Sequence, residues 1–226
     1  MNEINIKECL RMLKDKNLLL RKKAIINIGD IGDVLAVPNL LELLFQDYEQ
    51  SVRIESIIAL GKIKDTSCVP ALLKVVSEDS SIDVSSQAIW ALGEMGDKSV
   101  LPSLLKVVME EKSETLRKSA TVALGKIKDT SCVPALLKVV SEDSSIDVSS
   151  QAIWALGEMG ARASLPTLLK ILVSDEDSNI RISAISALSK IGDKAAMDAL
   201  LKVMNEDDNP DIREASTVAL RKIKYY

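Results

Sequence analysis

Apolar residues along this chain recur at helical spacing, in pairs of segments separated by short polar breaks. In residues 70–76, which begin with a proline, the apolar positions cover one broad helical face. After the polar residues 77–81, apolar side chains follow through residues 84–95 at spacings of three or four, a second helical stripe. Proline suits the first turn of a helix, and Gly96 suits the position just past the end of one. The pattern therefore predicts one helix that opens at residue 70 and a second that ends near residue 95.

This helical pair repeats every 32 residues along the whole chain. Residues 59–96 return letter for letter at residues 123–160, 64 residues later, and half of that offset brings the remaining residues into register. One pair cannot bury its own apolar face, so the repeats must stack. The sequence predicts an all-α protein, an α-solenoid with a right-handed superhelix, as a single domain over residues 1–226. Its seven repeats cover approximately residues 1–32, 33–64, 65–96, 97–128, 129–160, 161–192 and 193–226.

Several columns of this register match a known repeat consensus. Val-Arg at residues 52–53, Ala-Leu-Gly at residues 59–61 and Ile-Gly-Asp at residues 191–193 resemble the HEAT repeat. Within that family the columns resemble the HEAT-like repeats named after phycobilisome lyases, and the resemblance covers essentially the full chain. It implies an α-solenoid whose second helices line the concave side. It implies no particular chemistry.

The resemblance also implies a ladder between neighbouring repeats, in which an acidic residue precedes an arginine by six positions. Ser85 and Ser149 replace the arginine in the two identical repeats, so we expect the ladder to be interrupted there. Lys64, Lys128 and Lys224 replace the glycine that follows other second helices, and we expect those ends to be less tightly turned. The ladder matches are Asp15/Arg21, Asp47/Arg53, Glu111/Arg117, Asp175/Arg181 and Asp207/Arg213.

Both tryptophans of the chain lie on the face of the second helices that points away from the core, here the outer face; the resemblance places this face on the concave side. An advance of 100° per residue places five columns opposite the apolar stripe, and Trp90 and Trp154 stand in the central one. A tryptophan bordered by short polar groups is typical of an interface hot spot, because it offers a large contact area and loses few rotamers. In the second repeat these five columns are Ser51, Ile54, Glu55, Ile58 and Lys62, and we call them the lining columns.

We predict a protein- or peptide-binding site on this concave face, centred on the two tryptophans. The alternative is that both indoles tuck between adjacent repeats and only fill space. The predicted partner-binding residues are Trp90, Trp154, Gln87, Gln151, Asp83, Asp147, Ser86, Ser150, Glu94, Glu158, Ile58 and Val122.

Charged residues in the last lining column, and in one column of the first helices, have a structural interpretation. The last lining column alternates in sign, which predicts ion pairs between successive repeats worth about 0–1 kcal/mol each. It runs Asp30, Lys62, Glu94, Lys126, Glu158, Lys190 and Lys222. The first helices carry a row of lysines, and glutamates one turn later neutralise four of them: Lys74/Glu78, Lys106/Glu110, Lys138/Glu142 and Lys202/Glu206.

Composition excludes several classes of function. The chain has no histidine, which removes the commonest general base and metal ligand, and Cys9, Cys68 and Cys132 fall in packing columns. We expect no enzyme activity, no metal and no cofactor. The net charge of −4 and the balanced lining columns argue against nucleic acid. No apolar run is long enough to span a membrane, and no signal peptide is visible, so we expect a cytoplasmic location.

The preferred interpretation is a non-enzymatic interaction scaffold that binds a protein or a peptide. The alternative is an accessory subunit that resembles a bilin lyase or chaperone, with a nucleic-acid-binding HEAT-like protein as a weaker candidate. Self-association by end-to-end stacking of chains is a further expectation, because the first end carries few capping polar residues, and no membrane partner is expected.

Overall fold

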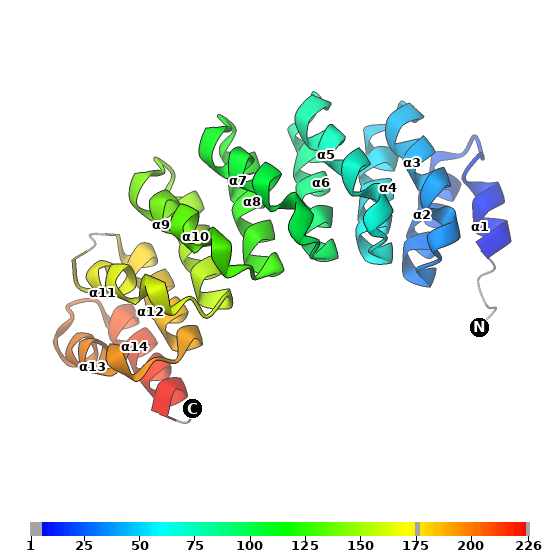
Figure 1. Ribbon diagram of the computed structural model, residues 1–226. Coiled ribbons are helices and arrows are strands. Elements are labelled where there is room, and N and C mark those ends of the chain that lie inside the picture. The colour runs from blue at the N-terminus through cyan, green and yellow to red at the C-terminus, as the bar shows by residue number, and fades with distance from the viewer. Residues whose placement is uncertain (1–5, 175–176, 225–226) are drawn as a thin grey trace. The chain divides into compact units, whose positions relative to one another are not determined.

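The computed structural model describes residues 6–174 and 177–224. These residues form fourteen α-helices joined by short turns, with no β-strand among them (Figure 1). The predicted all-α class and the two-helix repeat are therefore confirmed. The helices are α1 (Ile6–Met12), α2 (Leu18–Ile31), α3 (Val37–Gln46), α4 (Gln50–Ile63), α5 (Val69–Glu78), α6 (Ile82–Met95), α7 (Leu101–Glu110), α8 (Glu114–Ile127), α9 (Val133–Glu142), α10 (Ile146–Glu158), α11 (Leu165–Ser174), α12 (Ser178–Ile191), α13 (Met197–Glu206) and α14 (Pro210–Lys224).

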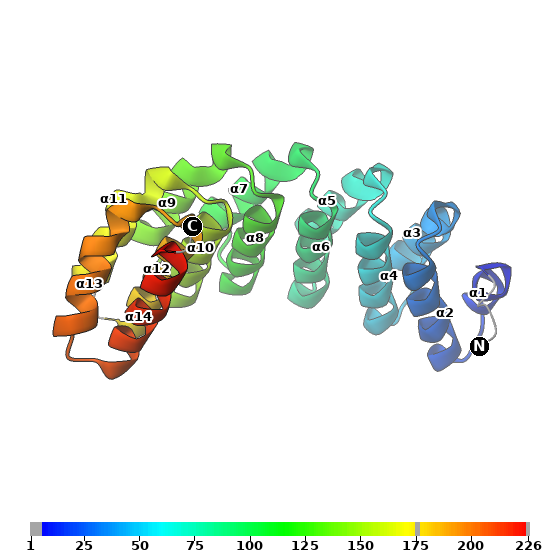
Figure 2. The same ribbon diagram turned by 90° about the horizontal axis from the view of Figure 1, so that it is seen from below.

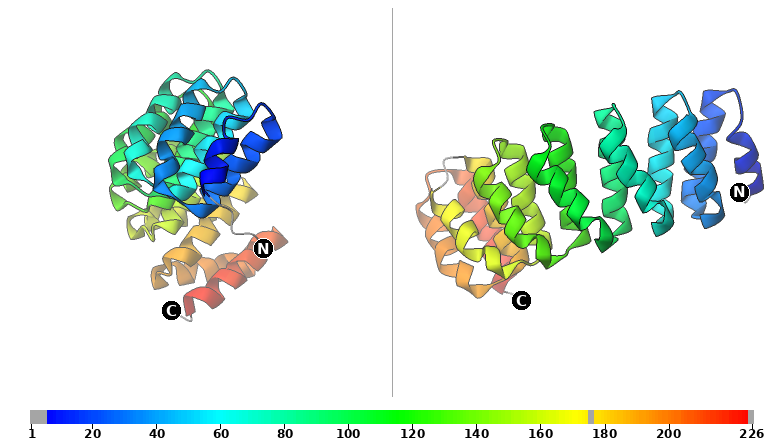
Figure 3. Two further views of the ribbon diagram at one scale, coloured as in Figure 1. Left: turned by 90° about the vertical axis from the view of Figure 1, so that its right-hand side faces the viewer. Right: turned by 45° about the horizontal axis from the view of Figure 1, so that its top comes forward.

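The chain divides into two compact units, residues 1–104 and residues 105–226, here the N-terminal and the C-terminal unit. In the N-terminal unit, the second helices α2, α4 and α6 lie side by side, and α3 and α5 pack against them (Figure 2). In the C-terminal unit, α8, α10, α12 and α14 form the layer of second helices, which α9, α11 and α13 cover (Figure 3). Helix α7 crosses the boundary. A single domain over residues 1–226 stays a prediction.

Capping residues set where the helices begin. Prolines occupy the first turn of α3, α5 and α9, where a missing N–H costs nothing. The hydroxyls of Ser81 and Ser145 accept backbone N–H groups at the start of α6 and α10. A 3₁₀ turn precedes each first helix from α3 onward, and in five of the six turns an aspartate caps it. Ala161 holds that position before η5 (Arg162–Ser164) and makes no side-chain cap.

The ends of α4 and α8 differ from the expectation of a looser turn. Lys64 and Lys128 take the same left-handed conformation as the glycines, with φ of 58° and 56° against 70° for Gly96. Their backbone N–H groups donate to the carbonyl oxygens of Leu60 and Leu124, which closes the last turn of each helix. The expectation was wrong because a lysine can occupy the left-handed region at a cost of about 1–2 kcal/mol. For Lys224 no following turn lies among the described residues.

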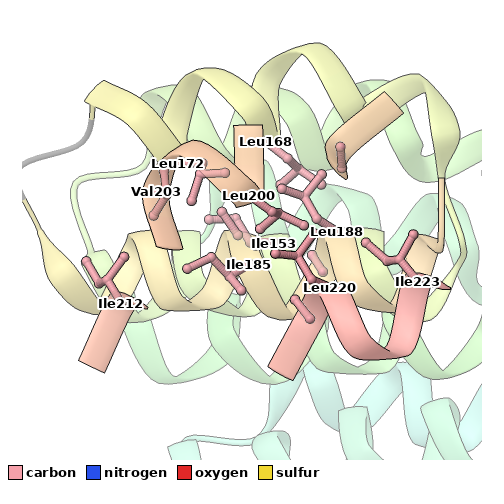
Figure 4. Close-up of a cluster of buried hydrophobic side chains, with 14 of the residues drawn as sticks. Ile153, Leu168, Leu172, Ile185, Leu188, Leu200, Val203, Ile212, Leu220 and Ile223 are labelled. Carbon is pink, nitrogen blue, oxygen red and sulfur yellow. The ribbon is translucent and has the colours of Figure 1, made fainter. Parts of the chain in front are cut away.

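Aliphatic side chains between the two layers form the core of each unit. In the N-terminal unit Leu40, Leu60 and Leu72 are fully buried. In the C-terminal unit one cluster joins α10 to α14, with Leu188 of α12 near its centre and Leu220 of α14 beside it (Figure 4). Each such leucine contributes about 1.5–3 kcal/mol through burial. Since the repeats within each unit bury their apolar faces against one another, the second helices of that unit are held in a fixed phase.

Arginines of the second helices build the predicted ladder. Four of them donate to the carbonyl oxygen six residues earlier, as Arg117 does to that of Glu111 (3.1 Å): Arg21, Arg53, Arg117 and Arg213. Arg181 donates to the carbonyl oxygen of Leu172 (3.1 Å). Ser85 and Ser149 instead donate to carbonyl oxygens within their own repeats, so the interruption is confirmed. Asp175, one predicted member, lies outside the described residues. The inter-repeat pairs are Arg21–Asp47, Arg53–Asp79, Arg117–Asp143 and Arg181–Asp207.

Candidate functional site

The predicted site residues lie on the second-helix layer of both units. Trp90 is on α6 in the N-terminal unit and Trp154 is on α10 in the C-terminal unit, and both side chains are half-buried. Asp83 and Asp147 are exposed, and the other predicted residues are half-buried. Helical phase predicts an apolar stripe on α4; Val52, Ser56, Ala59 and Leu60 of this stripe are buried, and Ile63 is half-buried. Binding by these residues stays a prediction.

Each indole has one edge packed against the glycine of the preceding repeat. A Cβ built on Gly61 would lie 3.0 Å from Cζ3 of Trp90, and one built on Gly125 would lie 2.6 Å from Cζ3 of Trp154. The glycines therefore make room for the six-membered rings. The indoles combine both sequence-based interpretations, because one edge fills space between repeats while each ring stays half-exposed on the outer face.

A lysine of the following repeat covers the ring of Trp154. The Nζ atom of Lys190 lies 5.6 Å from the ring centroid, within the range of a cation–π contact. Lys190 also bonds to Glu158, and Lys128 reaches the other oxygen of that carboxylate at 3.1 Å. The hydrogen bonds from Lys190 and Lys128 lower the pKa of Glu158 below its usual value. Glu158 is therefore ionised at neutral pH.

The two identical helices have different neighbours on their preceding side. Lys118 of α8 pairs with Asp147 of α10 at 2.7 Å. At the matching place in the N-terminal unit, Ile54 of α4 replaces the lysine, and the amide of Gln50 lies 3.5 Å from Asp83. The same sequence thus presents the same side chains in two electrostatic settings.

The predicted ion pairs along the last lining column are confirmed for two steps. Lys62 pairs with Asp30 at 2.7 Å, and Lys190 pairs with Glu158. The neutralised lysines of the first helices are confirmed for Lys74, 3.8 Å from Glu78, and for Lys138, 3.7 Å from Glu142. These contacts are exposed or partly exposed, so each contributes little to stability.

Sequence reasoning missed two equivalent clefts beside the first helices. One lies between α3 and α5, has a volume of about 350 Å³ and contains Phe45, Arg53 and Lys74. The other lies between α7 and α9, has a volume of about 290 Å³ and contains Met109, Arg117 and Lys138. The residues correspond pairwise at an offset of 64, and that offset is the only sequence signal for them. Both are lined by arginine–aspartate pairs of the ladder.

The cysteines and acidic groups form no reactive cluster among the described residues. Cys9, Cys68 and Cys132 are buried free thiols, and burial raises the pKa of Cys68 to about 11. Such thiols are weak nucleophiles at neutral pH. In residues 6–174 and 177–224, no three candidate ligands are grouped as a metal site would need. No helix in the described part of the chain is long and apolar enough to cross a membrane.

Comparisons with known proteins agree with this architecture. A family model described as HEAT repeats matches residues 6–80, 37–125, 69–140 and 133–221. No curated protein matches the chain. The complex of CpcE and CpcF of phycocyanin lyase from Nostoc sp. PCC7120 is similar at 21% identity and a TM-score of 0.62, over 97% of this chain and 88% of that one.

Two further solved structures share the fold. The HEAT-like repeats protein from Thermococcus onnurineus NA1 is similar at 17% identity and a TM-score of 0.56, over 100% of this chain and 99% of that one. Human deoxyhypusine hydroxylase in complex with glycerol is similar at 23% identity and a TM-score of 0.50, over 98% of this chain and 85% of that one. At these identities the likeness concerns the fold alone.

Proposed function

The chain belongs to the HEAT-repeat family, and we propose that it is a non-enzymatic scaffold that binds a protein or a peptide on its second-helix face. The observation that carries this proposal is the placement of Trp90 and Trp154. Both are half-buried in the central lining column, each seated on a glycine and bordered by short polar side chains. Such an indole offers contact area at a small entropic cost.

Three features of the chain support binding rather than catalysis. The lining columns present serines, glutamines and paired charges, which are typical of a contact surface. The thiols are buried, and the chain has no histidine. The clefts beside the first helices are lined by ion pairs that join successive repeats, so we assign them to the framework. A cytoplasmic location is part of the same proposal.

Selection of peptides from a random displayed library against the full chain tests the proposal. W90A/W154A should weaken binding of the selected peptides by about 30-fold or more, because even one tryptophan hot spot contributes about 2 kcal/mol or more. The matched control is L35A/F45A, which truncates two exposed apolar side chains outside the second helices and should leave affinity unchanged. Equal affinity of W90A/W154A and wild type, with unchanged helicity, would place the binding site elsewhere.

The accessory-subunit alternative makes a different prediction. A bilin-handling protein would acquire visible absorbance when mixed with a free bilin and would lose it after W90A/W154A. A scaffold for proteins should stay colourless in the same mixture. Absorption spectra of the two samples therefore separate the two functions.

A further inference from the structure

The surface around Trp154 carries more positive than negative charge. Among the lining columns of α8 and α12 the only charged side chains are lysines, and the carboxylates belong to α10 itself. Both carboxylates are already paired with lysines: Asp147 with Lys118, and Glu158 with Lys190 and Lys128. The pairings leave a positive excess beside the indole.

The lysines around Glu158 retain unused hydrogen-bond donors. An ammonium group has three N–H donors, and a bond to Glu158 occupies one of them in each lysine. The side chains of Lys128 and Lys190 are 54% and 40% exposed, so the remaining donors can be reached from solvent. Glu158 is less exposed, at 23%. Two accessible ammonium groups therefore flank one half-exposed indole.

We propose that the Trp154 surface, defined by Lys128, Trp154, Glu158 and Lys190, binds an acidic segment of a protein partner. An apolar side chain of the segment packs on the exposed part of the indole, and neighbouring carboxylates accept hydrogen bonds from Lys128 and Lys190. This assignment rests on the proposed function and adds the chemistry of the partner. The positive excess is complementary to carboxylates, which supplies specificity and faster association.

A protein segment fits this surface better than a nucleic acid strand does. A phosphate backbone needs a continuous basic track. Beyond α12 the lining columns of α14 carry the carboxylates of Asp211 and Glu214, which would repel it. The surface is a short positive patch beside an aromatic ring, and an acidic peptide with an apolar residue matches both parts.

Fluorescence titration of the full-length variant W90F isolates the signal of Trp154. The probes are a glutamate–leucine peptide, the same peptide with glutamine in place of glutamate, and oligothymidylate of equal charge. We expect a saturable change in Trp154 fluorescence with the glutamate peptide and with neither of the other two probes. The affinity for the glutamate peptide should be about ten-fold lower in W90F/K128Q/K190Q, because two exposed ion pairs are lost. The matched control W90F/K138Q/K170Q removes two lysines from the first helices, so it has the same net charge and should bind as W90F does.

Each other outcome overturns the proposal. Equal response to the glutamate and glutamine peptides, or no effect of K128Q/K190Q, would remove the role of the lysines. Tighter binding of oligothymidylate would assign the patch to nucleic acid. If library-selected peptides need Trp154 but show no acidic preference, only this inference fails. If no peptide of any charge depends on Trp154, the proposed function fails with it.

Discussion

At the scale of single residues, backbone conformation overrides the preference of the residue type. Each second helix must end in a tight turn so that the first helix of the following repeat can pack against the core. A left-handed residue makes that turn, and glycine takes it without strain. Lys64 and Lys128 adopt the same conformation as Gly96, so the fold imposes the turn where the sequence does not favour it.

Replacing Lys64 with glycine should therefore stabilise the protein. The expected gain in the free energy of unfolding is about 1 kcal/mol, because the left-handed strain of a residue with a Cβ is removed. Urea unfolding of K64G and wild type measures it. K64A is the matched control, since alanine keeps the Cβ and should leave the urea midpoint nearly unchanged. A gain of the same size in K64A would assign the effect to the lost charge.

The tryptophans show how far residue-level prediction reaches. Helical phase places Trp90 and Trp154 on the outer side of α6 and α10, and no distance between helices is needed for that result. The contact of Trp154 with Gly125 depends on how closely α8 and α10 approach, which a single sequence does not encode. The same holds for Lys190, which stands 36 residues after Trp154 and reaches its ring only through the stacking of repeats.

At the scale of helices, the arginine ladder varies in strength from one step to the next. Arg117 contacts both oxygens of Asp143, at 2.8 and 3.0 Å, whereas Arg53 comes only within 3.8 Å of Asp79. The sequence predicts where the ladder is interrupted, because a serine cannot replace the guanidinium. It does not predict which steps are bidentate, since that depends on small shifts between neighbouring helices.

R117A should therefore destabilise the protein more than R53A does. We expect a loss of about 2 kcal/mol for R117A, which removes two charge-assisted hydrogen bonds from a largely buried carboxylate. R53A should cost about 0.5 kcal/mol, as a weak partly exposed pair does. Urea midpoints of the two variants at neutral pH measure the difference. Equal losses would contradict the bidentate geometry as the source of stability.

The same pair predicts a pH dependence. The hydrogen bonds from Arg117 lower the pKa of Asp143 below its usual value. Its contribution to stability is therefore complete above the unfolded pKa of about 3.9 and is lost as the pH falls through the lower folded pKa. Wild type should lose stability more steeply than D143N below about pH 4, so the gap between their urea midpoints should narrow there. A constant gap would mean that Asp143 contributes nothing through its charge.

At the scale of the whole molecule, each repeat is stabilised chiefly by its neighbours. Leu60 of α4 and Leu188 of α12 occupy the same column, and both are fully buried, one in each unit. In a stacked array, a cavity in one repeat destabilises other repeats only if they are energetically coupled to it. The sequence predicts one domain from an unbroken register, but a register does not measure that coupling.

Truncation of these two leucines tests how far the coupling extends. L188A should cost about 2–5 kcal/mol through the cavity it leaves in the cluster of α10 to α14. If the two units open separately, hydrogen exchange should rise in α10 to α14 and stay slow in α2 to α6, and L60A should give the reverse pattern. If exchange rises equally along the chain in both variants, the coupling is strong and residues 1–226 form the single cooperative domain that the register predicts. In that case a partner held at Trp154 would also slow exchange in α2 to α6, since ligand binding stabilises every helix that unfolds with its site.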